Sequence, residues 1–224
     1  DEYDLIMENI NKMTEALSKS EILKKEFISN VSHEIKTPLA LIQNYAKALL
    51  CQNLEEETRE KYLSILVKNS EKLSNLVSNI LKLNKLENQP RLKELENVNI
   101  GELLRESILQ FEDIVDKKNI DLNCSIADVK MDIQPGYAEI IFNNLISNAI
   151  KFSNKGGKVD IELKLKGENI VFKIKDYGLG MSKEVGSRIF EKFYQGDTSH
   201  SGEGNGLGLA LVKRVIDIIG GQIQ

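Results

Sequence analysis

Apolar side chains recur every three or four positions along residues 1–50, a spacing that is typical of amphipathic helices. Ile6, Ile10, Met13 and Leu17 follow the 4-3-4 spacing of a coiled-coil seam. The stripe resumes at Leu23 in a shifted register, as it does at a stutter. We therefore expect residues 1–26 to form a coiled-coil helix that pairs with another helix.

A second apolar stripe predicts another long helix, which starts after a turn at residues 51–57 and ends near residue 87. This stripe is wider than a two-stranded seam needs. It consists of Tyr62, Leu63, Leu66, Leu73, Leu76, Val77, Ile80 and Leu83. A single helical hairpin leaves much of the stripe exposed. We expect residues 27–88 of two copies to bury it in a dimeric four-helix bundle.

The pattern changes after the second helix. Residues 89–97 contain Pro90 and several charges, and we interpret them as a linker. Further along we expect helices at 100–118, 136–152 and 206–219, a short helix within 185–194, and alternating strands at 120–126, 158–165 and 169–175. Helices mixed with hairpin strands predict an α+β fold, with a layered α/β sandwich over residues 98–224.

Composition excludes some classes of protein. The net charge of -4 gives no general attraction to nucleic acid. The two cysteines are far apart, fit no metal-ligand spacing and favour a reducing compartment such as the cytosol. The sequence has no apolar run long enough to span a membrane. It begins inside a helical pattern and ends at GGQIQ, so we expect both ends to lie within a longer protein.

One of the two histidines, His33, lies on the predicted first helix. At about 100° per residue it falls on the face opposite the apolar stripe, and is therefore exposed. Glu34 follows it directly, and Thr37 lies one turn along the same exposed face. An exposed histidine beside a carboxylate fits a nucleophile with its own base. An ordinary surface histidine explains this stretch equally well when it is taken alone.

The predicted helix at 136–152 carries Asn143, Asn144 and Asn148, although asparagine is a poor residue inside helices. Asn144 and Asn148 are neighbours on one edge, and Lys151 continues it. Amide oxygens beside an ammonium group suit Mg²⁺ and phosphate. The alternative is a polar helix edge in solvent.

Two glycine-containing segments follow. Asp176 ends a strand and precedes Gly178 and Gly180, whose spacing allows a tight turn close to a ligand. Its carboxylate could accept a hydrogen bond from an exocyclic amine such as that of adenine. Residues 202–209 then open a helix with exposed backbone N–H groups, which suits phosphate. Alone, each segment is weak support for a site.

In this order, the motifs of the chain resemble those of two-component sensor histidine kinases. SHEIKTPL is similar to the family's H box, and NNLISNAIKFS is similar to its N box. DYGLGM resembles the first glycine box, IFEKFYQGD the F box and GEGNGLGLALVK the second glycine box. The resemblance covers nearly the whole chain. It implies a dimerisation and histidine-phosphotransfer domain followed by an ATP-binding domain of the GHKL class.

The resemblance also implies roles for individual residues. His33 matches the residue that ATP phosphorylates, and Glu34 matches the acid that orients and deprotonates it. Asn148 matches a Mg²⁺ ligand, Lys151 a phosphate contact and Asp176 the residue that recognises adenine. The implied catalytic residues are His33, Glu34, Thr37 and Asn144. The implied ATP-binding positions are Asn144, Asn148, Lys151, Phe152, Asp176, Gly178, Gly180, Lys192, Gly204, Gly206, Leu207 and Gly208.

Four departures from the family pattern stand out. Gln195 occupies the place of an arginine that grips the γ-phosphate in many relatives, so Lys192 is expected to share that task. Tyr177 stands where asparagine is common, and we expect no consequence from it. Ile219 replaces a usual histidine before two glycines, and the chain stops at Gln224 where the family's closing strands begin.

The sequence therefore predicts the cytoplasmic core of a homodimeric sensor kinase. His33 would take a phosphoryl group from Mg-ATP and pass it to an aspartate on the receiver domain of a response regulator. Any link to a membrane would run through sensory segments outside this chain. By resemblance, the pattern of His33, Glu34 and Thr37 also fits dephosphorylation of the regulator. A Thr37 hydroxyl bonded back to its own helix near Pro38 is the structural alternative.

Two other functions fit part of the pattern. One is a non-enzymatic dimeric scaffold with a degenerate nucleotide pocket, which Gln195 favours and the intact N and glycine boxes disfavour. The other is a GHKL ATPase of the chaperone or topoisomerase kind. Those proteins lack a long upstream helix that bears His-Glu, so the H box separates the two classes.

Overall fold

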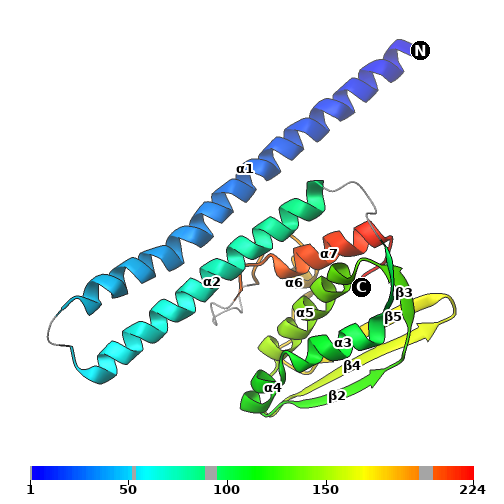
Figure 1. Cartoon of the computed structure of the whole chain (residues 1–224). Helices are drawn as coiled ribbons and strands as arrows, with labels where there is room; N and C mark the ends of the chain where they lie inside the picture. Colours follow the sequence, from blue (N-terminus) through cyan, green and yellow to red (C-terminus); the bar gives the residue numbers. More distant parts are fainter. Residues whose placement is uncertain (1, 52–53, 89–94, 197–203) are drawn as a thin grey trace. The chain divides into compact units, whose positions relative to one another are not determined.

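The computed structural model describes residues 2–51, 54–88, 95–196 and 204–224, drawn in Figure 1. The chain forms two compact units, Asp1–Ser78 and Asn79–Gln224. The last turns of the second helix belong to the second unit. The boundary between the units therefore precedes the segment at 89–97 that we interpreted as a linker, most of which lies outside the described residues.

Two helices make the first unit, as predicted. Helix α1 is Glu2–Leu49, and helix α2 is Glu56–Asn88. Glu56 and Glu57 occupy the first turn of α2, where negative charge favours the helix dipole. The rings of Tyr45 and Tyr62 meet across the hairpin with centroids 4.9 Å apart. The coiled-coil seam of α1 is exposed in the single chain.

Five strands are described in the second unit. β2 (Asp121–Ile126) runs parallel to β4 (Lys158–Lys166), and β4 pairs antiparallel with β5 (Asn169–Asp176). A separate antiparallel pair joins β1 (Glu96–Asn99) to β3 (Lys130–Ile133). Gly167 turns the β4–β5 hairpin with a φ of 62°. The hairpin strands expected at 158–165 and 169–175 are therefore confirmed.

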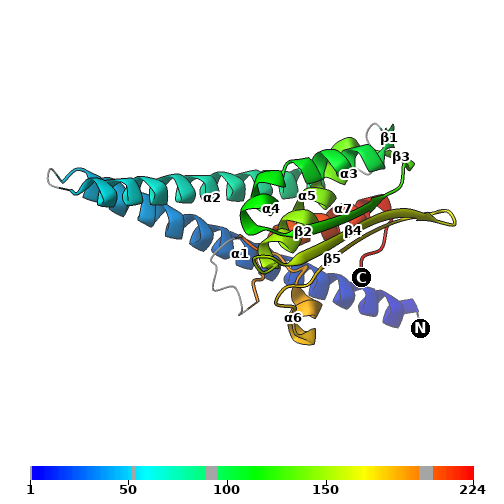
Figure 2. The same ribbon diagram turned by 90° about the horizontal axis from the view of Figure 1, so that it is seen from below.

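Helices cover one face of the three-stranded sheet (Figures 1 and 2). They are α3 (Ile100–Leu109), α5 (Pro135–Phe152) and α7 (Gly208–Ile219). Val159, Ile161 and Leu163 alternate along β4 and are almost fully buried, so they supply the sheet side of the core. The ring of Phe172 on β5 meets Phe142 on α5 with centroids 5.0 Å apart. The α+β sandwich is confirmed.

Some predicted elements were wrong in detail. The helix expected at 100–118 is divided into α3 and α4 (Glu112–Lys118), and α4 ends at Asn119 in the left-handed conformation. Residues 96 and 97, interpreted as linker, belong to β1. The short helix expected within 185–194 is α6 (Lys183–Arg188). Strands β1 and β3 were not predicted, because each has four residues, too few for an alternating pattern to stand out.

Candidate active site

His33 lies on α1 with 81% of its side chain exposed. The Nδ1 atom of the imidazole is 3.9 Å from Oε1 of Glu34, whose side chain is 24% exposed. The exposed placement predicted from the helical spacing is confirmed. The imidazole is thus presented to solvent with a half-buried carboxylate beside it.

Thr37 makes a contact within its own helix. Its Oγ1 donates a hydrogen bond to the backbone oxygen of His33 over 3.2 Å. Pro38 follows inside α1 and is buried. Since proline cannot donate to the carbonyl of Glu34, this turn has one fewer backbone hydrogen bond. The hydroxyl of Thr37 therefore supports the turn on which His33 sits.

The second half of α5 is the centre of the predicted nucleotide site. Asn144 donates through Nδ2 to the oxygen of Ile140 over 2.7 Å, which leaves its Oδ1 directed at Gly208. A Cβ atom added to Gly208 would lie only 2.5 Å from that oxygen. A Cβ added to Gly204 would lie 3.2 Å from Nζ of Lys151. The N box and the second glycine box are therefore in contact, and the glycines leave room that a side chain would fill.

The first glycine box meets the end of the same helix. A Cβ atom on Gly178 would lie 2.0 Å from the backbone oxygen of Phe152, so only glycine fits. The amide of Gly178 donates to Oδ1 of Asp176 over 3.1 Å. Lys118, at the end of α4, donates to the oxygens of Ile150 and Lys151 over 2.9 and 3.0 Å. This lysine caps α5 and fixes the end of the helix against which the loop packs.

The F box packs on the second glycine box. The amide of Phe193 donates to the oxygen of Gly206 over 2.9 Å, and Phe193 takes a φ of 63°. Gln195 donates through Nε2 to the oxygen of Gly204 over 3.2 Å. The residue that stands in place of the usual arginine therefore ties the two motifs together.

Other predicted residues have different surroundings. Lys192 pairs with the carboxylate of Glu87, near the end of α2 and inside the second unit. The side chain of Leu207 is fully buried, so it is a core residue with its backbone at the loop. Asn148 is half-buried one turn after Asn144. Gly180 has a φ of 66° and open space around it. His200 and residues 202 and 203 lie outside the described residues.

Sequence reasoning missed the part played by Asn205. It is 92% buried, and its Oδ1 accepts hydrogen bonds from the amide of Leu207 over 3.2 Å and from Asn79 over 3.5 Å. It thereby shapes the loop that opens α7. An asparagine two residues before an orphan amide is an Asx-turn signal that could have found it.

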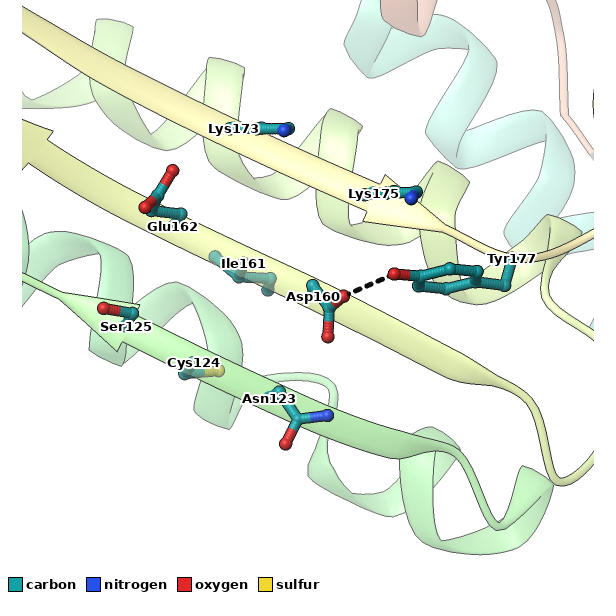
Figure 3. A pocket seen from close by; sticks show the side chains of 9 residues that line it. All are labelled: Asn123, Cys124, Ser125, Asp160, Ile161, Glu162, Lys173, Lys175 and Tyr177. Atoms are coloured by element: carbon teal, nitrogen blue, oxygen red, sulfur yellow. Dashed lines mark hydrogen bonds between the residues drawn. The ribbon is translucent and has the colours of Figure 1, made fainter.

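An open hollow lies on the face of the sheet opposite the helices (Figure 3). Its lining residues are Asn123, Cys124, Ser125, Asp160, Ile161, Glu162, Lys173, Lys175 and Tyr177. None of the sequence-predicted ATP-binding residues is among them. This hollow is therefore separate from the cluster at the end of α5.

Models of two protein families match two separate parts of the chain. A model of the His Kinase A (phospho-acceptor) domain matches residues 23–89, which include His33. A model of the histidine kinase-, DNA gyrase B- and HSP90-like ATPases matches residues 135–224, which include the N box and both glycine boxes. The heme sensor protein HssS of Staphylococcus aureus is 31% identical over all 224 residues of this chain. The chain belongs to the two-component sensor histidine kinases.

Solved sensor kinases have the same fold. The Acinetobacter baumannii histidine kinase AdeS is 26% identical, with a TM-score of 0.65 over 83% of this chain and 86% of that one. Full-length ShkA in complex with AMPPNP is also 26% identical, with a TM-score of 0.59 over 87% of this chain and 41% of that one. The kinase spans 48% of the length of HssS. The described part of the kinase contains no helix that is both long and apolar enough to cross a membrane.

Proposed function

We propose that this kinase chain transfers the γ-phosphoryl group of Mg-ATP to the imidazole of His33 and then to an aspartate of a response regulator. The observation that carries the proposal is the contact of both glycine boxes with the second half of α5. Asn144 meets Gly208, Lys151 meets Gly204, and the backbone of Phe152 meets Gly178. The same chain also presents His33, with Glu34 beside it, on the exposed side of α1.

The groups in the cluster fit ATP and Mg²⁺ by their chemistry. Amide oxygens of Asn144 and Asn148 are hard ligands that suit Mg²⁺, and the ammonium group of Lys151 suits phosphate. The start of α7 adds backbone N–H groups and partial positive charge beside the glycines. The carboxylate of Asp176 would accept a hydrogen bond from the amine of adenine. ATP would supply the phosphoryl group, and Lys192 would share in holding it.

The work of the protein in this reaction is positioning and charge neutralisation. Glu34 would orient the imidazole of His33 and take its proton, which frees a ring nitrogen for attack. Lys151 and the N–H groups of the loop would offset charge on the phosphates. Thr37 would act afterwards, when the regulator loses its phosphoryl group.

We also propose that the kinase works as a homodimer in the cytoplasm, as part of a longer membrane sensor. The exposed apolar seam of α1 supports pairing, and the match to half of HssS supports a longer protein. A receiver domain is the partner we propose, because the His Kinase A match covers the exposed His33.

The test is incubation with γ-labelled ATP and Mg²⁺, with His33→Gln and His200→Gln compared with the parent. The parent and His200→Gln should take up acid-labile, base-stable label, because His33 carries the phosphoryl group. His33→Gln should bind ATP normally and take up none. Label that persists in His33→Gln, or that is acid-stable, contradicts the proposal.

A further inference from the structure

Tyr177 follows Asp176 and turns back over the outer face of the sheet. Its Oη donates a hydrogen bond to Oδ2 of Asp160 on β4 over 2.8 Å (Figure 3). In the β4–β5 register, Asp160 faces Lys175, two residues before Tyr177. The phenol therefore ties the residue just beyond the end of β5 to the third residue of the neighbouring strand, β4.

Two lysines complete this contact. Nζ of Lys175 lies 4.4 Å from the centroid of the Tyr177 ring, and Nζ of Lys158 lies 5.6 Å from it. Lys158 also pairs with Oδ1 of Asp160 over 3.1 Å. The hydrogen bond from Tyr177 and then that from Lys158 lower the pKa of Asp160. Asp160 is thus a charged acceptor at neutral pH, and charged acceptors form the stronger hydrogen bonds.

Alternation along the strand places Asp176 on the other face. Lys173, Lys175 and Tyr177 all line the outer hollow. Asp176 has the parity of Phe172, whose ring meets α5 on the helix side. On that side, Gly178 fits against the backbone of Phe152 and donates to Asp176. Asp176 is therefore held from both sides: Gly178 fixes its carboxylate on the inner face, and Tyr177, the next residue along the chain, is tied to the outer face.

We infer that Tyr177 is a positioning residue that sets Asp176 for adenine recognition. The inference rests on the proposed function, because it takes Asp176 as the group that accepts from the adenine amine. The resemblance of the sequence to the kinase family gave Tyr177 no role, since its hydrogen bond to Asp160 appears only in the fold. A tyrosine that is merely part of the surface would affect stability and leave the choice of base unchanged.

The experiment measures binding of ATP and GTP with Mg²⁺ by calorimetry in the parent, Tyr177→Phe, Asp160→Ala and Asp176→Asn. Tyr177→Phe removes only the hydroxyl. It should raise the dissociation constant for ATP about two- to fivefold, the range expected for one partly exposed hydrogen bond. GTP binding and the melting temperature should stay unchanged. Asp160→Ala should lose the same preference for ATP.

A double-variant cycle makes the test specific. When Asp176 is already Asn, Tyr177→Phe should cause no further loss, because the group that it positions is gone. Glu162→Gln is the matched control. It breaks an ion pair on the same face of the sheet, between Oε2 of Glu162 and Nζ of Lys164, which are 2.8 Å apart and do not involve Tyr177. It should leave the preference for ATP intact.

Each other result counts against the inference. Equal losses of ATP and GTP in Tyr177→Phe, or no loss of either, overturn the positioning role. An additive loss in the double variant also overturns it. If Asp176→Asn itself keeps the full preference for ATP, the adenine role of Asp176 is wrong and the role of Tyr177 falls with it.

Discussion

Gly208 begins α7 against the side chain of Asn144, and no larger residue fits there without displacing it. The oxygen of Asn144 is the nearest atom to the missing Cβ, at 2.5 Å. A methyl group at this place would push on the N box, where we propose that phosphate and Mg²⁺ bind. Gly208 therefore leaves the space that Asn144 needs at the proposed ligand site.

We expect Gly208→Ala to weaken ATP binding by about tenfold or more, since overpacking at a tight contact costs roughly 1–3 kcal/mol. Binding is measured by titration calorimetry with Mg²⁺ present. Gly136→Ala is the matched control, because a Cβ there meets nothing within 4 Å. Equal ATP affinity in the two variants would show that Gly208 is not at the site.

Thr37 offers a second test at this scale. Its hydroxyl donates to the oxygen of His33, but its own oxygen can still accept a hydrogen bond from a water molecule. We expect Thr37→Ala to keep autophosphorylation near normal and to slow regulator dephosphorylation about tenfold, some 1.4 kcal/mol of barrier. The measurement is the decay of purified phospho-regulator with each variant.

Thr14 provides the control for Thr37. It makes the same kind of contact, from Oγ1 to the oxygen of Ile10 over 2.9 Å, elsewhere on α1. Thr14→Ala should leave both activities unchanged. If Thr37→Ala loses autophosphorylation and dephosphorylation together, Thr37 is structural and serves the turn around Pro38.

The sequence could indicate candidate residues for the site but not their contacts. Asn144, Lys151 and the glycines were predicted from residue types and motif order. The hydrogen bond from Gln195 to Gly204 was not predicted, because it depends on how the F box folds over the second glycine box. The hydrogen bond from Tyr177 to Asp160 was not predicted either, because these two residues become neighbours only when β4 and β5 pair.

How closely each helix or strand was predicted depends on how clearly its pattern of apolar residues repeats in the sequence. α1, α2 and α5 were predicted closely because a helical period repeats many times along each of them. β1 and β3 were missed, since four residues give no more than two repeats. The break between α3 and α4 was also missed, because the apolar period continues across it.

Asn99 links a missed strand to a predicted helix. As the N-cap of α3 it accepts hydrogen bonds from the amides of Gly101 and Glu102 over 3.0 and 3.3 Å. We expect Asn99→Ala to lower the free energy of unfolding of the second unit by about 1 kcal/mol. Urea unfolding followed by circular dichroism measures this. Asn99→Ser keeps a capping oxygen and should unfold near the parent midpoint; a shift as large as that of alanine refutes the cap.

At the scale of the whole molecule, apolar exposure on the helical unit calls for a second chain. Ile10 and Leu17 are 49% and 65% exposed on α1, and Leu63 and Val67 on α2 are 48% and 57% exposed. Such surface is normally covered by a partner. The apolar stripes in the sequence could indicate this need, but not which faces meet.

We therefore expect the kinase chain to have twice the mass of one chain in light scattering at micromolar concentration. Leu17→Glu should shift it toward monomer, because a charge in the seam opposes pairing. Lys12→Gln lies on α1 outside the seam and should stay dimeric. A parent that scatters as a monomer, or a Leu17→Glu variant as dimeric as the parent, would rule out pairing through this seam.

Helix α5 serves both the core and the proposed ligand site, and this limits which substitutions the sequence can accept. One helix supplies core side chains such as Ile146, amides such as Asn144 and the backbone that receives Gly178. Along this helix only Glu139, Ser147 and Phe152 are classed as exposed, and Phe152 is no more than 38% exposed. A substitution that repacks the core would therefore disturb the ligand groups as well. Tuning of nucleotide affinity is left to the loops and strand ends around α5, where a residue such as Tyr177 lies outside the core.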